Sequence, residues 1–154
     1  MNKAIFLDRD GVINEEVGFL HQKENIKFYP QAIDALKILS RSAYKIIIIT
    51  NQAGIGRGLY TEEEYRIFEG EYIDELAKFA KEIRIDKIYH CPHHPAEGIG
   101  EYKVDCECRK PKPGMLFQAQ KDFNLNLGES YLIGDKRSDI EAGKAAGCKT
   151  ILVK

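Results

Sequence analysis

The chain has 154 residues, 44% of them hydrophobic, with 23 Lys and Arg against 24 Asp and Glu and a formal net charge of −1. This length suffices for one domain with its own core, and the balanced charge argues against a nucleic-acid partner, because proteins that bind the phosphate backbone usually carry a basic excess. No apolar run approaches 18 residues and Met1–Lys3 lead directly into a strand, so we expect one domain over residues 1–154, no membrane span, no signal peptide and a cytoplasmic location.

Short apolar runs alternate with helical patterns along the whole chain. The runs are bounded by polar residues, as expected of short buried strands, and Ile46–Ile49 is apolar on both faces, which is typical of a central strand. The predicted strands are Ala4–Leu7, Ile46–Thr50, Ile85–Tyr89, Tyr131–Ile133 and Thr150–Val153.

Four segments between these strands carry helical periodicity or helix-capping signals. They begin at Pro30, at the Thr61–Glu64 capping box, at Pro113-Gly114 and at about Ser138, and they extend to Ala43, Phe79, Phe123 and Ala146. Strands that alternate with helices imply right-handed crossovers. The sequence therefore predicts an α/β fold, a doubly wound domain with a parallel sheet.

Two carboxylates stand where the first predicted strand ends. Asp8 and Asp10 lie two residues apart, and Gly11 allows a turn close behind them. In parallel α/β sheets, ligands bind in the crevice beyond the carboxyl ends of the strands. A carboxylate pair there can hold a hard divalent cation, while one carboxylate attacks an electrophile and the other moves a proton. Taken alone, the motif is equally consistent with a solvated Asp-rich turn.

Polar groups also follow the second and fourth predicted strands. Thr50–Gln52 precede a glycine-rich stretch whose hydroxyl and backbone N–H groups suit a phosphate oxygen. After Gly134, Asp135 can complete a metal site with the first-strand carboxylates, and Asp139 can support that site from the next helix. A cationic segment, Arg109–Lys112, lies before the third predicted helix; on its own it is typical of a solvated turn.

The long loop at residues 91–110 carries three cysteines and a histidine. Cys91 and His93 form one pair at i and i+2, and Cys106 and Cys108 form another. This Cys₃His set suits tetrahedral Zn²⁺, and in a cytoplasmic chain such a cluster indicates a metal rather than disulfides. Because all four positions are protein ligands, we predict a structural zinc that staples this segment, here called the zinc loop.

In order along the chain, these motifs resemble the haloacid dehalogenase-like phosphohydrolase superfamily: Asp-x-Asp, then Thr, then Lys, then Gly-Asp-x-x-x-Asp. The match runs over nearly the whole chain. The resemblance implies that Asp8 is a nucleophile that forms an aspartyl-phosphate and that Asp10 is the general acid and base. It also implies Mg²⁺ at Asp8, the Asp10 backbone carbonyl and Asp135, with Thr50 and Lys110 binding the phosphoryl group.

The zinc loop narrows the resemblance to the capless phosphatases of D-glycero-D-manno-heptose 1,7-bisphosphate, which are related to histidinol-phosphate phosphatases. The heptose branch is favoured by the twelve residues between His93 and Cys106, by Thr50–Gly58 and by the Pro-Gly-Met at 113–115. By resemblance, Arg109 binds the second phosphate of the substrate. The other implied substrate contacts are Asn51, Gln52, Ala53, Lys136, Glu16, Val17, Gly18 and Phe19. No segment is long enough for a cap domain, so the zinc loop and residues 8–29 shape the pocket.

Three alternatives remain open at this point. Hydrolysis of histidinol phosphate or another sugar phosphate would use the same chemistry on a different leaving group. A signalling receiver domain also combines Asp, Thr, Lys and Mg²⁺, but its phosphoacceptor follows strand three, where this chain has Cys91 and His93. A nucleic-acid-binding zinc module would need a basic, aromatic surface. We expect a monomer whose partner is a small sugar bisphosphate.

Overall fold

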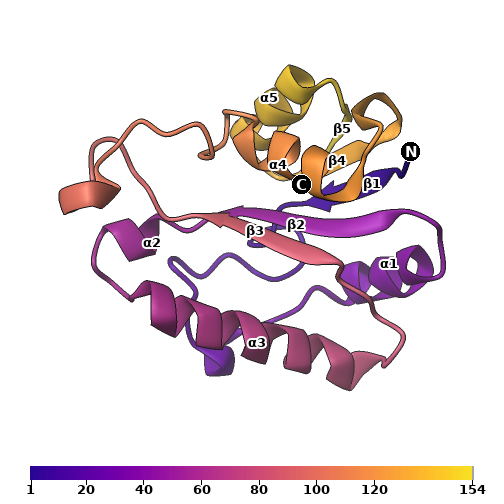
Figure 1. Cartoon of the computed structure of the whole chain (residues 1–154). Helices are drawn as coiled ribbons and strands as arrows, with labels where there is room; N and C mark the ends of the chain where they lie inside the picture. The colour runs from indigo at the N-terminus through magenta and orange to yellow at the C-terminus, as the bar shows by residue number, and fades with distance from the viewer. Residues whose placement is uncertain (154) are drawn as a thin grey trace.

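The computed structural model describes residues 1–153 and contains a five-stranded parallel sheet (Figure 1). The strands are β1 (Ala4–Leu7), β2 (Lys45–Asn51), β3 (Lys87–Cys91), β4 (Tyr131–Gly134) and β5 (Lys149–Leu152). Their order in the sheet is β3-β2-β1-β4-β5, so the residues that follow the central strand β1 lie between those that follow β2 and β4. The predicted doubly wound α/β architecture is confirmed.

Helices cover both faces of this sheet (Figure 1). One face is covered by α1 (Pro30–Ser40) and α3 (Glu62–Phe79) and the other by α4 (Gly114–Phe123) and α5 (Arg137–Ala146), while the short α2 (Ala53–Gly56) follows β2. Ile46 and Ile48 pack with the first pair of helices, whereas Ile47 and Ile49 pack with the second. Because successive strand side chains point to opposite faces, the Ile46–Ile49 run supplies both cores. Within residues 1–153, no helix is both long and apolar enough to cross a membrane.

The helix ends follow the predicted capping chemistry. The Thr61 hydroxyl accepts from the Glu64 N–H and the Glu64 carboxylate accepts from the Thr61 N–H, both at 3.0 Å, which is the predicted capping box. Gly147 ends α5 with φ +85°, a left-handed conformation that favours glycine.

Several element boundaries differ from the prediction. The third strand begins at Lys87 rather than Ile85, because the Asp86 carboxylate binds the Ile46 N–H just ahead of it. The first helix ends at Ser40 instead of reaching Ala43. The last strand runs one residue earlier than predicted, and α2 was not predicted at all.

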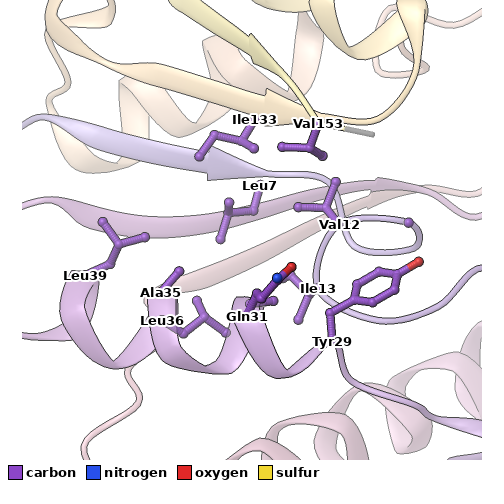
Figure 2. Close-up of a pocket in the computed structure, with 12 residues that line it drawn as sticks. Leu7, Val12, Ile13, Tyr29, Gln31, Ala35, Leu36, Leu39, Ile133 and Val153 are labelled. Carbon is purple, nitrogen blue, oxygen red and sulfur yellow. The ribbon is translucent and has the colours of Figure 1, made fainter.

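An apolar pocket of about 420 Å³ lies between α1 and the sheet (Figure 2). Leu7 and Ile133 line it from the strands, and Ala35 and Leu39 line it from the helix. Its remaining lining includes the segment 11–13, so this pocket lies behind the loop that carries Asp8 and Asp10. Because none of its lining residues carries a charge, the pocket does not suit a phosphate, and the candidate site lies elsewhere.

Candidate active site

A buried lysine joins two carboxylates at the carboxyl end of the sheet. The Lys110 ammonium donates to Asp8 Oδ1 at 2.9 Å, to Asp139 Oδ1 at 2.6 Å and to the Ile49 carbonyl at 3.0 Å. The three charged residues are 4%, 6% and 1% exposed. Removing one partner of a buried ion pair strongly destabilises the folded protein. The contacts of Lys110 with Asp8 and Asp139 therefore hold this zinc-loop lysine firmly against the sheet. From the sequence, Lys110 was predicted as a site residue only because of its place in the family motif.

Burial and neighbouring charges act in opposite directions on this group. Burial raises the pKa of Asp8 to about 7, although the Lys110 ammonium acts to lower it. Burial acts to lower the pKa of Lys110, but the carboxylates of Asp8 and Asp139 raise it above its ordinary value. Lys110 is therefore charged at neutral pH, and a further cation beside Asp8 would favour the ionised carboxylate.

Asp135 completes a group of three carboxylates. One oxygen each of Asp8, Asp135 and Asp139 lies within 4.8 Å of the other two. Asp135 Oδ1 is buried and finds no hydrogen-bond partner within residues 1–153. Asp139, by contrast, accepts from Lys110 with Oδ1 and from the Lys136 N–H with Oδ2 at 3.1 Å. An unpartnered carboxylate oxygen beside Asp8 fits a hard divalent cation such as Mg²⁺, with Asp139 in a supporting position.

Two glycines allow these carboxylates to approach one another. Gly11 has φ +87°, and a Cβ atom there would lie 2.1 Å from Asp135 Oδ2. A Cβ atom at Gly134 would lie 2.2 Å from Asp139 Cβ. A side chain at Gly11 would therefore collide with Asp135 in the loop after β4, and one at Gly134 would displace Asp139 in the first turn of α5.

Asp10 contacts a separate network of buried polar side chains. Arg9 Nε and Nη2 donate to Asp10 Oδ1 and Oδ2, each at 3.0 Å. Asn14 Nδ2 donates to Asp10 Oδ1 at 2.9 Å, and Asn14 Oδ1 accepts from the Tyr72 hydroxyl at 2.7 Å. Sequence reasoning assigned no role to Arg9, Asn14 or Tyr72, because no pattern distinguishes a buried arginine from an exposed one.

A cleft of about 550 Å³ opens beside these groups. The charged residues that line it are four cations and two acids: Arg57, Arg109, Lys110, Lys136, Asp10 and Glu16. The uncharged residues that line it are Gly18, Phe19, Asn51, Gln52, Ala53, Tyr60, Pro111 and Ser138. A smaller cavity of about 60 Å³ shares several of these residues and adds Asp8, Thr50 and Asp139. The lining of the larger cleft has two more cations than acids, and Asp8 and Asp139 in the adjoining cavity balance these two charges.

The side chains after β2 are tied into this site by hydrogen bonds. Asn51 binds the backbone of Lys110 on both sides, donating to its carbonyl at 3.2 Å and accepting from its N–H at 3.1 Å. The Gln52 amide donates to the Thr50 hydroxyl at 2.8 Å and accepts from the Tyr60 hydroxyl at 2.6 Å. Asn51 and Gln52 therefore hold Lys110 and Thr50 in position.

The loop at residues 16–19 crosses the cleft mouth between two cations. Glu16 lies 3.8 Å from the Lys136 ammonium, and the Phe19 ring lies 5.2 Å from the Arg57 guanidinium. Arg57 Nε is buried without a hydrogen-bond partner in the described part of the chain, and sequence reasoning missed this residue inside its glycine-rich stretch. Val17 is the one predicted loop contact that lines a neighbouring surface cavity instead of the cleft.

The four predicted zinc ligands come together as one compact group. The Cys91, Cys106 and Cys108 sulfurs lie 2.7–3.4 Å apart, and His93 Nδ1 lies 3.6 Å from the Cys91 and Cys108 sulfurs. Four ligands around Zn²⁺ with Zn–S bonds of about 2.3 Å would be about 3.8 Å apart. The separations of 3.4 and 3.6 Å are near that spacing, and the Cys91 and Cys108 sulfurs lie closer together, at 2.7 Å. The contact with Cys108, together with burial, raises the pKa of the Cys91 thiol, so a thiolate there needs a compensating cation.

Comparison with known proteins places this chain among sugar-phosphate phosphatases. Residues 107–154 match the family model described as HAD-hydrolase-like. The D-glycero-β-D-manno-heptose-1,7-bisphosphate 7-phosphatase of Haemophilus influenzae is 46% identical over 156 aligned positions, which cover 100% of this chain and 83% of that protein. The chain belongs to the D-glycero-D-manno-heptose-1,7-bisphosphate 7-phosphatase family of HAD-like hydrolases.

Two further members of this heptose phosphatase family show how close the match is. The D-glycero-α-D-manno-heptose-1,7-bisphosphate 7-phosphatase of Photorhabdus laumondii is 47% identical over 99% of this chain and 82% of its own length. The D,D-heptose 1,7-bisphosphate phosphatase of B. bronchiseptica, solved with magnesium and phosphate, has a TM-score of 0.85 and 30% identity over 97% of this chain and 79% of that one. Relatives named for opposite anomers are thus about equally similar to this chain.

Proposed function

We propose that this chain is a Mg²⁺-dependent phosphatase that removes the 7-phosphate of D-glycero-D-manno-heptose 1,7-bisphosphate. The observation that carries the proposal is the buried Asp8–Lys110–Asp139 group beside the unpartnered Asp135 oxygen, at the edge of a cleft lined by four cations. Related proteins support the proposal, because they are named for this activity and the structure of one was solved with magnesium and phosphate.

The reaction proceeds in two displacements at phosphorus. An Asp8 carboxylate oxygen attacks the 7-phosphate, forming an O–P bond as the bond from phosphorus to the sugar oxygen breaks, and Asp10 gives that oxygen its proton. Water then attacks the aspartyl-phosphate, Asp10 takes a proton from the water, and the Asp8 carboxylate leaves phosphorus. Phosphate is released with both carboxyl groups in their starting states.

The cation belongs with the carboxylates. The residues that would hold Mg²⁺ are Asp8, Asp135 and the backbone carbonyl of Asp10; bound there, the ion supplies positive charge for the phosphoryl oxygens. Lys110 and the Thr50 hydroxyl supply further donors to the same oxygens. Asp139 orients the Lys110 ammonium and compensates its charge.

The remaining cleft residues select the substrate. Arg109 is the proposed ligand of the second phosphate, because a planar guanidinium binds a phosphate through two parallel hydrogen bonds. Lys136, the segment 51–53 and the loop at 16–19 surround the sugar. In this assignment Val17 contributes only through the backbone of its loop, since its side chain lines another cavity.

We further propose that Cys91, His93, Cys106 and Cys108 hold a structural Zn²⁺. The proposal is supported by the four ligand atoms, which lie within 4.8 Å of one another, because four protein ligands fill a tetrahedral zinc site. Cys108 lies two residues before Lys110, so a zinc staple would also fix the lysine. The prediction of a cytoplasmic monomer rests on the sequence alone.

The test is steady-state phosphate release in the presence of Mg²⁺, with both anomers of heptose 1,7-bisphosphate, histidinol phosphate and an aryl phosphate. We expect kcat/KM for one heptose anomer to exceed kcat/KM for each of the other substrates by about 100-fold or more. Comparable turnover of histidinol phosphate would reassign the substrate. No turnover of any ester, with both metals verified, would refute a phosphatase.

A further inference from the structure

Arg9 is a buried charge whose carboxylate partner is the proposed acid–base residue. It is 2% exposed, and its guanidinium lies 5.2 Å from the centre of the Phe68 ring and 5.5 Å from that of Tyr72. Both of its hydrogen bonds to Asp10 measure 3.0 Å, and a third reaches the Leu20 carbonyl at 3.3 Å. A guanidinium packed against aromatic rings in the core is costly unless a carboxylate compensates it.

The bidentate contact fixes the orientation of the carboxylate. Two parallel N–H···O bonds define the plane of the Asp10 carboxyl group, whereas one bond would leave it free to turn about the Cβ–Cγ bond. Burial acts to lower the pKa of Arg9, but the Asp10 carboxylate raises it above its ordinary value, so the guanidinium is always charged.

Asn14 and Tyr72 extend this support to α3. Asn14 is fully buried; its amide donates to Asp10 Oδ1, and its own oxygen accepts from the Tyr72 hydroxyl. The Asn14 carbonyl also accepts from the Gly11 N–H at 2.7 Å, which closes the loop behind the two aspartates. Three hydrogen bonds therefore restrain a carboxylate that still lines the cleft.

We propose that Arg9 is a positioning residue that holds the Asp10 carboxylate in the orientation needed for proton transfer, and that Tyr72 contributes to the same restraint through Asn14. The inference rests on the proposed phosphatase function. Arg9, Asn14 and Tyr72 are absent from the lining of both cavities at the site, so they act through Asp10 and not on the substrate.

The leaving group of the substrate provides the test. A sugar alkoxide needs a proton as it leaves, whereas 4-nitrophenolate leaves almost without one, so misplacing Asp10 should affect kcat/KM for the two esters unequally. Arg9→Lys keeps the charge but cannot chelate both carboxylate oxygens. We expect it to lower kcat/KM for the heptose bisphosphate by about 100-fold and for 4-nitrophenyl phosphate by less than about 5-fold, each relative to wild type.

Tyr72→Phe is the second variant, because it removes one hydroxyl and leaves the ring packed. The same direction is expected, with a loss of about 3- to 10-fold on the sugar substrate alone. Tyr65→Phe is the matched control: Tyr65 is another buried tyrosine of α3, but its hydroxyl binds Glu69 on the same helix. It should leave the ratio of the two kcat/KM values unchanged.

Equal losses on both esters, or a lower melting temperature with unchanged kcat/KM per folded molecule, would overturn the inference and leave Arg9 a structural clamp. If Arg9→Lys does not fold, the ratio measured for Tyr72→Phe against Tyr65→Phe decides. A wild-type protein that hydrolyses neither ester contradicts the phosphatase itself, and this result is distinct from an active wild type whose variants show no leaving-group dependence.

Discussion

At the carboxyl end of the sheet, Asp8 and Asp139 lie against Lys110, so the chain itself neutralises part of their charge, whereas the four ligand atoms of the zinc loop lie close to one another. The first group is held by a salt bridge that is complete within the polypeptide. The second has three crowded thiols and one imidazole, and no cationic side chain contacts their ligand atoms in residues 1–153. This difference indicates that the arrangement of the Cys₃His side chains depends on a bound cation far more than the arrangement of Asp8, Lys110 and Asp139 does.

The two groups are also connected through the backbone. Cys108 belongs to the thiol group and Lys110 to the carboxylate group, with Arg109 between them. We therefore expect disturbance of the thiols to reach the lysine, and loss of the contacts of Lys110 with Asp8 and Asp139 to reach the loop.

The largest expected effect comes from removing the nucleophile. Asp8→Asn should lower kcat by about 10⁴-fold or more, because an amide cannot form the aspartyl-phosphate. The fold should persist, since Lys110 keeps its contact with Asp139. Phosphate release at high enzyme concentration and a thermal melt check both points. Activity above about 1% of wild type would remove Asp8 from this role.

Lys110→Met tests whether the carboxylate group is compensated from within the chain. It should lower the free energy of unfolding by about 3–5 kcal/mol, because two buried carboxylates lose their partner. Mg²⁺ should restore part of this loss. The measurement is urea denaturation with and without Mg²⁺. The control is Lys112→Met, two residues away, where the ammonium contacts only exposed acids and no change is expected.

Removing zinc tests the dependence of the second group. We expect the melting temperature to fall by at least about 5 °C and activity to fall with it as Lys110 shifts. Three thiols should then react with a thiol reagent, while Cys148 stays protected because burial raises its pKa to about 11. Removing only Mg²⁺ should expose none of them. Unchanged melting after verified zinc loss would contradict the staple.

The smallest effect is expected at the residue between the two groups. Arg109→Ala should lower kcat/KM for the bisphosphate by about 10- to 100-fold, which corresponds to the loss of a charge-assisted hydrogen bond. It should change kcat/KM for a sugar monophosphate little. A steady-state comparison of the two substrates measures this. Equal losses would mean that Arg109 does not contact the second phosphate.

The fold could be predicted because the strands are short apolar runs and the site residues follow them directly. Asp8, Thr50 and Asp135 required only the positions of strand ends, and the Cys₃His group required only spacing. The start of β3 was misplaced because Ile85 is as apolar as the strand itself, and only the contact of Asp86 with Ile46 ends the preceding loop.

What could not be predicted depends on packing between distant segments. Arg9 stands between the two aspartates of the motif, but its burial against Phe68 and Tyr72 follows from where α3 lies. Arg57 was hidden for a similar reason, since its contact with Phe19 joins loops that follow different strands. Sequence spacing carries no information about such contacts.

The zinc loop has a consequence for how this scaffold can change. Cys108, Arg109 and Lys110 are consecutive, so we expect insertions or deletions between the proposed zinc ligand and the proposed site lysine to abolish activity. The twelve residues at 94–105 lie outside both groups, between two anchored ends. Gly98 and Tyr102 in this segment are closely packed, but Glu97 lies 4.0 Å from the cleft residue Arg57. Evolution and protein engineering can therefore change the other positions of this segment next to the cleft without altering either group.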